Sequence, residues 1–337
     1  MSVSLDFVRR SRYNIDMDTF ENKKILVIAD SNLTNSFFLE YLRSSFVAEN
    51  KRVHMFNGGI PGARMDMVMN CVEEEISAEK PDYVLLSFGG NDLGGWLYDS
   101  TLEITEAVLK ERAERNQSYE NALKEVIDYL RFQKIEPILM TPMCYDENLV
   151  ESEEITTDKD NKEKALIGNA FFKRATFKNI NQDLKDLRDI GVQIAWEKGI
   201  AVWNIFTETH ERVDHSCFIE DGVHYNEKGH WIMAELFYKH MFGEELKAYP
   251  IPESVKEISV LEADARAYFF AKYNIVFLSE GRKDGDALVQ AVQSFIERKG
   301  YEEGLTKERA DGFFRFVKAP FEKQKEIARK IKRLYEV

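Results

Sequence analysis

Short hydrophobic runs alternate with amphipathic stretches along the first 246 residues of this 337-residue chain. A run of five to seven apolar or β-branched residues is typical of a strand buried on both faces. Apolar residues spaced three and four apart are typical of a helix that packs on one face. The strand pattern occurs at residues 24–29, 52–56, 82–87, 137–141 and 200–206. We therefore expect five short strands separated by helices.

Helical spacing fills the intervals between these runs. It is clearest in two sets of apolar residues, Met65, Val68, Met69, Val72 and Ile76 in one and Leu123, Val126, Ile127 and Leu130 in the other. Gly199 marks the end of the helix before the last strand, because a helix often ends in a left-handed turn that favours glycine. Strand–helix alternation predicts a parallel sheet whose ligands bind beyond the carboxyl ends of its strands. The predicted fold is α/β, with three layers (α/β/α) around a five-stranded, mostly parallel sheet.

The pattern changes at residues 249–252, where two prolines within four residues cannot continue a helix. Beyond them the strand pattern fades to one apolar run at residues 275–278, and helical patterns occur near residues 253–273, 286–299 and 306–334. An acidic stretch at residues 151–164 is expected to form a long loop. We divide the chain into an N-terminal arm (1–22), an α/β domain (23–246) and a helical C-terminal extension (247–337).

The negative charge is concentrated in the α/β domain. Residues 1–246 hold 28 Lys and Arg against 44 Asp and Glu, a balance of −16, whereas the remainder carries 18 against 15, a balance of +3. A binding surface for nucleic acid needs a basic face. The charge therefore argues against nucleic acid as a partner, and repulsion disfavours strongly anionic substrates.

The cysteines and the hydrophobic runs indicate the cellular setting. Cys71, Cys144 and Cys217 are scattered without metal-binding spacing, which argues against a disulfide framework and a zinc cluster. No apolar run approaches the roughly 18 residues of a membrane span, and charged residues interrupt the start of the chain. We expect a cytoplasmic protein with no stable membrane insertion, and a homo-oligomer remains open.

Polar residues with chemical potential follow the predicted strands. Ser31 comes directly after the first strand, residues 57–63 (NGGIPGA) after the second and residues 89–92 (GGND) after the third, and Asp221 and His224 precede the last helix of the domain. A serine at a helix N-terminus lies where backbone N–H groups favour developing negative charge. An aspartate three residues before a histidine can orient its imidazole. Taken singly, the first three segments are also explained as a helix cap or a tight turn.

The four segments together resemble the SGNH hydrolase superfamily, also called GDSL esterases and lipases. The resemblance rests on Asp-Ser after the first strand, N-x-G-x-x-G after the second, G-x-N-D after the third and D-x-x-H before the last helix. It extends from about Lys23 to Phe242 and implies a flavodoxin-like fold. One departure is Ala29, which occupies the position of the family's usual glycine before Asp-Ser.

The resemblance implies a role for each matching residue. Ser31 would be the nucleophile, His224 the general base and Asp221 the residue that orients His224. The oxyanion hole would consist of the Ser31 backbone N–H, the Gly62 backbone N–H and the Asn91 side-chain amide. The implied reaction is hydrolysis of a carboxylic ester through an acyl-enzyme, with no cofactor and no metal.

The substrate is less well defined than the reaction. Trp96, Tyr145 and Tyr225 lie near the four segments and are the candidates for substrate binding, although aromatic faces suit sugar rings, acyl chains and core packing alike. We expect a short-chain or acetyl ester of a carbohydrate or another small molecule, so that a carbohydrate O-deacetylase is one form of this prediction.

Other interpretations remain. The same acyl-enzyme would serve an acyltransferase, and a lipase or thioesterase would act on longer acyl chains. A non-enzymatic module that binds an acylated glycan is disfavoured because the site residues are intact. His210 and His215 are five residues apart and would not share the helix face that a zinc protease requires. Cys144 follows a strand, but no motif places a base beside it.

Overall fold

The computed structural model describes residues 20–34, 37–70, 72–98, 100, 102–147, 177–219, 221–263 and 320–335. Three predictions lie outside these residues: the long loop at 151–164, the apolar run at 275–278 and the helical pattern at 286–299. Most of the N-terminal arm (1–22) lies outside them as well. No helix among the described residues combines the length and the apolar character needed to cross a bilayer.

Five parallel strands form one sheet. They are β1 (Lys24–Ala29), β2 (His54–Asn57), β3 (Tyr83–Ser87), β4 (Glu136–Met140) and β5 (Ala201–Trp203), in the order β2-β1-β3-β4-β5. All neighbouring pairs are parallel. The predicted fold is therefore confirmed. The strand order reverses at β1, and a parallel sheet binds its ligand in the crevice at such a reversal.

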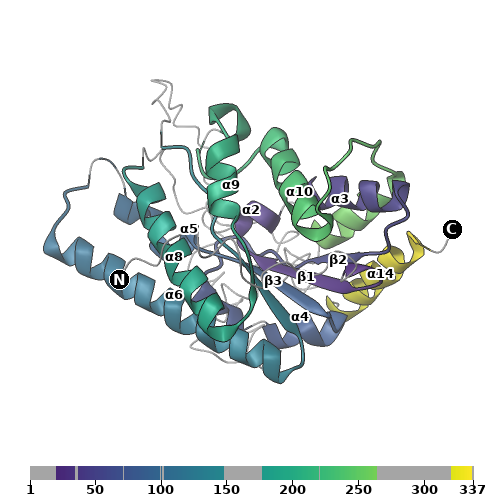
Figure 1. Ribbon diagram of the computed structural model, residues 1–337, viewed down its shortest axis with the longest axis horizontal. Helices are drawn as coiled ribbons and strands as arrows, with labels where there is room; N and C mark the ends of the chain where they lie inside the picture. Colours follow the sequence, from purple (N-terminus) through teal and green to yellow (C-terminus); the bar gives the residue numbers. More distant parts are fainter. Residues whose placement is uncertain are drawn as a thin grey trace, which may run out of the picture.

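Helices cover both faces of the sheet (Figure 1). The connection from β1 to β2 runs opposite to those that lead to β3, β4 and β5. Right-handed crossovers therefore place the intervening helices on opposite faces. One face carries α3 (Phe37–Ala48) and α10 (Glu227–Phe242), which pack on each other. The other carries α4 (Val72–Glu79), α6 (Glu106–Phe132) and α8 (Ile180–Lys198).

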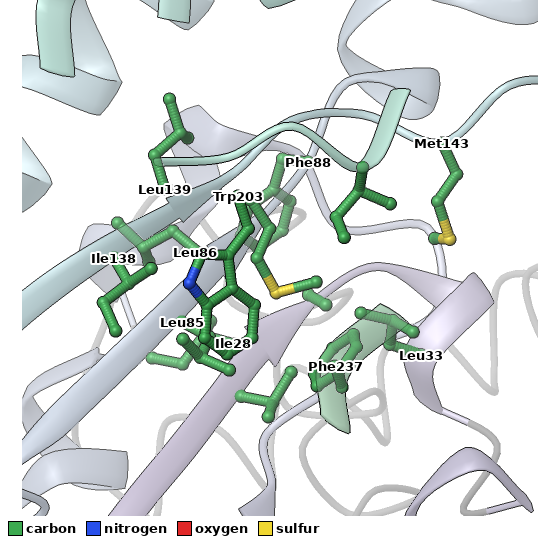
Figure 2. Close-up of a cluster of buried hydrophobic side chains, with 14 of the residues drawn as sticks. Ile28, Leu33, Leu85, Leu86, Phe88, Ile138, Leu139, Met143, Trp203 and Phe237 are labelled. Carbon is green, nitrogen blue, oxygen red and sulfur yellow. The ribbon is translucent and has the colours of Figure 1, made fainter. Parts of the chain in front are cut away.

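The core lies between the sheet and these helices. Figure 2 shows Ile28, Leu85, Leu86 and Ile138 from the central strands beside Trp203 and Phe237. Apart from Trp203, which is 3% exposed, none of these residues exceeds 1% exposure. The Trp203 and Phe237 rings meet edge to face with centroids 5.5 Å apart. Strands covered on both faces need continuous apolar runs, which is why the sequence pattern located them.

The end of the fifth strand was predicted wrongly. β5 stops at Trp203, and Ile205 and Phe206 begin the helix α9 (Ile205–Arg212). The Asn204 side chain caps that helix by accepting a hydrogen bond from the Thr207 amide at 3.4 Å. A short apolar run cannot distinguish a buried strand from a buried helix start. The helix end at Gly199 is confirmed, with a left-handed φ of 63°.

Two described segments of the C-terminal extension pack at the β2 edge of the sheet. Residues 253–263 are helical, and α14 (Pro320–Arg333) lies beside β2 and α4 (Figure 1). Beyond α14, the Tyr335 hydroxyl donates to the Val53 carbonyl at 2.6 Å. These contacts cover an edge strand that would otherwise offer unpaired backbone groups to another chain.

Candidate active site

Ser31 lies two residues after the end of β1, an inner strand of the sheet. It is the first residue of the short helix α2 (Ser31–Thr34). Asp30 forms the turn, because its carboxylate accepts the Asn32 amide at 3.0 Å and its carbonyl accepts the Thr34 hydroxyl at 3.0 Å. The serine is therefore held at the carboxyl end of the sheet, at the strand order reversal.

Asp221 and His224 lie in the turn before α10. Gly222 has a left-handed φ of 68°, which lets the chain fold back on itself. One Asp221 carboxylate oxygen accepts the backbone amides of Val223 and His224, at 2.8 Å and 2.9 Å. The carboxylate is thus fixed by its own turn, and its second oxygen remains for the imidazole.

A chain of hydrogen bonds joins these three side chains. His224 Nδ1 lies 2.5 Å from Asp221 Oδ2, and His224 Nε2 lies 2.8 Å from Ser31 Oγ. With a neutral imidazole, the Nδ1–H donates to the carboxylate and Nε2 accepts the serine hydroxyl. The serine and the histidine are 193 residues apart in sequence, yet the geometry suits transfer of the serine proton to the imidazole.

The two ionisable members of this chain have opposed pKa shifts. Burial lowers the pKa of His224, but the hydrogen bond to Asp221 and the charges of Asp221 and Asp30 raise it more, so that it lies above its usual 6.5. Burial raises the pKa of Asp221, but its bonds from His224 and the backbone amides hold it below 3.8. The carboxylate therefore stays ionised at neutral pH and stabilises the protonated imidazole.

The loop after β2 runs alongside the Ser31 turn. The Asn57 side chain accepts the Gly59 amide at 2.8 Å and donates to the Thr34 carbonyl at 2.8 Å. A Cβ on Gly59 would lie 2.7 Å from the Thr34 backbone, so the approach requires glycine. The loop then reaches Gly62, which is exposed and has a left-handed φ of 73°.

Asn91 comes from the short helix α5 (Gly90–Leu93), close behind β3. Its amide donates to the Ala63 carbonyl at 3.2 Å, next to Gly62. An amide nitrogen carries two N–H groups, so this bond uses one of them. The structure thus brings the loop of Gly62 together with Asn91.

Two buried carboxylates near the site had no role in the sequence analysis. Asp92 accepts the Met65 amide at 2.8 Å, and its second oxygen has no hydrogen-bond partner among the described residues. Burial raises the pKa of Asp92 to about 7 and that of Asp30 to about 6. Asp30 belongs to the Asp-Ser motif and Asp92 to the G-x-N-D motif, but a sequence motif does not show that a carboxyl group is buried.

The three substrate-binding candidates have different surroundings. The Tyr145 hydroxyl lies 1.9 Å from where a Cβ on Gly90 would stand, and the charges of Asp30, Asp221 and Asp92 help burial to raise its pKa. It therefore lies beside the site.

Tyr225, in contrast, is 2% exposed, and its hydroxyl donates to the Cys144 carbonyl at 3.2 Å. These contacts make it a packing residue. Trp96 lies in the 3-10 helix η3 (Gly95–Tyr98), but its side chain is outside the described part of the structure.

Two of the histidines outside the motif pair with carboxylates. His215 Nδ1 lies 2.6 Å from Asp146 Oδ2, and His240 Nε2 lies 2.6 Å from Glu208 Oε2. Within the described ranges, no group of three or more His, Cys, Asp and Glu side chains could hold a metal ion.

A parallel sheet that joins a serine, a histidine and an aspartate at its carboxyl edge is an arrangement capable of acyl transfer. Residues 18–237 match the family of GDSL-like lipases and acylhydrolases. The chain therefore belongs to this family and is a carboxylic ester hydrolase.

Several solved structures are similar to this chain. A gut microbial diltiazem-metabolizing enzyme is 14% identical, with a TM-score of 0.64 over 94% of this chain and 95% of that one. The lipase/acylhydrolase from Enterococcus faecalis is 17% identical over 67% of this chain and 100% of its own, with a TM-score of 0.45. Axe2, an acetylxylan esterase from Geobacillus stearothermophilus, is 20% identical over 68% and 98%, with a TM-score of 0.48. No curated protein matches the chain.

Proposed function

We propose that this protein is a serine esterase that uses Ser31, His224 and Asp221 as a catalytic triad. The observation that carries the proposal is the continuous chain of hydrogen bonds from Ser31 Oγ through the imidazole to Asp221, with distances of 2.8 Å and 2.5 Å. A serine hydroxyl is a weak nucleophile at neutral pH, and a base within hydrogen-bond reach removes this limitation.

The reaction proceeds in two halves. His224 Nε2 takes the proton of Ser31 as Oγ attacks the ester carbonyl, and the imidazolium then gives this proton to the departing alcohol. Water next attacks the acyl-enzyme with the same histidine as base, which releases the acid and restores the serine. Asp221 holds the imidazole in the required tautomer and stabilises its positive charge.

The negative oxygen of each tetrahedral intermediate needs donors that are already in place. The Ser31 backbone N–H, the Gly62 backbone N–H and the Asn91 amide are the donors in this proposal. The contact of Asn91 with the carbonyl after Gly62 supports a common site for two of them. Loss of one such donor costs about 10²- to 10³-fold in kcat.

The surroundings of the site favour a small, polar ester. The Tyr145 hydroxyl lies over Gly90, the residue before Asn91, and the buried carboxyls of Asp30 and Asp92 lie nearby. Polar groups this close to the site favour a substrate that is itself short and polar. We therefore assign a short acyl group, with acetyl esters of carbohydrates as the leading substrate class.

Hydrolysis of p-nitrophenyl acetate, butyrate and octanoate by the wild type and by Ser31→Ala tests this function. We expect turnover that falls with chain length, and a loss of about 10³-fold or more in Ser31→Ala. Ser216→Ala, which changes an exposed serine, is the matched control and should retain full activity. Equal turnover by wild type and Ser31→Ala would refute the triad. An organophosphonate that labels Ser31 would exclude a binding module.

A further inference from the structure

An ion pair is buried between the α/β domain and the C-terminal extension. Arg43 of α3 donates to both carboxylate oxygens of Glu262, at 2.8 Å and 2.6 Å. The side chains are 0% and 2% exposed. Removing two charges from water is so costly that apolar residues of similar size often serve stability equally well.

Glu262 also reaches the end of β2. Its Oε1 atom accepts the backbone amide of Asn57 at 3.1 Å, and Arg43 donates to the Met55 carbonyl at 2.7 Å. The pair therefore fixes the last residues of β2, at the point where the chain leaves the sheet for the candidate oxyanion loop.

Asn57 connects this contact to the site. Its side chain holds the Gly59 amide and the Thr34 carbonyl, both at 2.8 Å. Thr34 ends the four-residue helix that Ser31 begins, and Gly59 lies three residues before Gly62. A continuous series of hydrogen bonds thus runs from Glu262 through Asn57 to both the nucleophile turn and the oxyanion loop.

We infer that Glu262 is a positioning residue, through which the C-terminal extension aligns the oxyanion loop with Ser31. This inference rests on the proposed function. A displacement of about 1 Å at a reacting group can cost about 10²-fold in rate, even when the change lies far from the chemistry. Loss of the Glu262 contact should therefore lower kcat and leave KM nearly unchanged.

Two variants separate positioning from stability. Arg43→Met combined with Glu262→Leu removes both charges, so that folding is preserved, but it also removes the acceptor for the Asn57 amide. The buried Asn57 amide and Met55 carbonyl lose these partners, so we expect a modestly lowered Tm together with a kcat lowered about 10- to 100-fold. Glu262→Gln keeps an acceptor oxygen but leaves Arg43 without its counter-charge. We expect a lowered Tm and a kcat much closer to that of the wild type.

Tyr335→Phe is the matched control, because it removes another hydrogen bond from the extension to the same edge of the sheet. It should leave kcat and KM unchanged. A kcat equal to wild type in the Arg43→Met, Glu262→Leu variant would overturn the inference. Ser31→Ala is assayed in parallel, since its failure to lose activity would refute the proposed function instead. The rate of organophosphonate labelling provides a second readout of the Ser31 geometry.

Discussion

Asp221 and Glu262 each pair with a nitrogen-containing side chain, but the two pairs lie in different regions of the molecule. Asp221 bonds His224 at the carboxyl edge of the sheet, where the two side chains remain 23% and 26% exposed. Glu262 bonds Arg43 at the β2 edge, where almost no surface remains exposed. An imidazole changes its charge near neutral pH, whereas a guanidinium remains protonated.

The Asp221–His224 pair can therefore take part in proton transfer, whereas the Glu262–Arg43 pair can only fix the position of the groups that it contacts. His224 keeps one nitrogen for Ser31, whereas two Arg43 nitrogens are committed to Glu262. We therefore expect the first pair to act in the reaction and the second to fix the structure around it. Substitutions in each pair should have different effects.

The largest effect is expected from His224→Ala. Because it removes the one base that contacts Ser31 within the described part of the chain, kcat for p-nitrophenyl acetate should fall by about 10⁴-fold or more, while the unfolding temperature stays within a few degrees. His215→Ala is the control, since it removes a second histidine that pairs with a carboxylate. A comparable loss of kcat in the two variants would contradict the role of His224 as the general base.

Arg43→Ala should produce the opposite result, a loss of stability. It leaves the Glu262 carboxylate buried without its counter-charge, which typically costs about 3–5 kcal/mol in the free energy of unfolding. Urea denaturation would measure this. Lys110→Ala, which removes an exposed ion pair with Glu114, should change the free energy by less than about 1 kcal/mol. If both variants lost less than about 1 kcal/mol in the free energy of unfolding, the Arg43–Glu262 pair would not be buried from water.

The smallest effect concerns pH. His224 must be neutral to accept the serine proton, so activity should fall as the pH drops through its pKa, which is raised above 6.5. Asp221→Asn removes the two largest interactions that raise this pKa, and it leaves the burial that lowers it and the weaker effect of the Asp30 charge. The acidic limb of kcat/KM should therefore move to lower pH while the maximum rate falls. An unmoved limb would mean that another group controls it.

The sequence predicted the strands and the site segments because their signals are local. The apolar run ending at Ala29 and the serine that follows it stand within a few residues of each other. The start of α9 escaped prediction because Ile205 and Phe206 continue an apolar run in either structure. Glu262 escaped for a different reason: its partner lies 219 residues away, and an isolated glutamate in a helical pattern suggests a solvated face.

The separation of Ser31 from its partners has a consequence for the time at which activity arises during synthesis. A ribosome adds about 5–20 residues per second, so the 193 residues between Ser31 and His224 take roughly 10 to 40 s. The proposed nucleophile is therefore made long before the proposed base, and Glu262 and α14 follow later still. A nascent chain would carry an inactive Ser31 and an uncovered β2 edge. Ser31 would gain its hydrogen-bond partner, and β2 its cover, only after the segments with His224, Glu262 and α14 have been made.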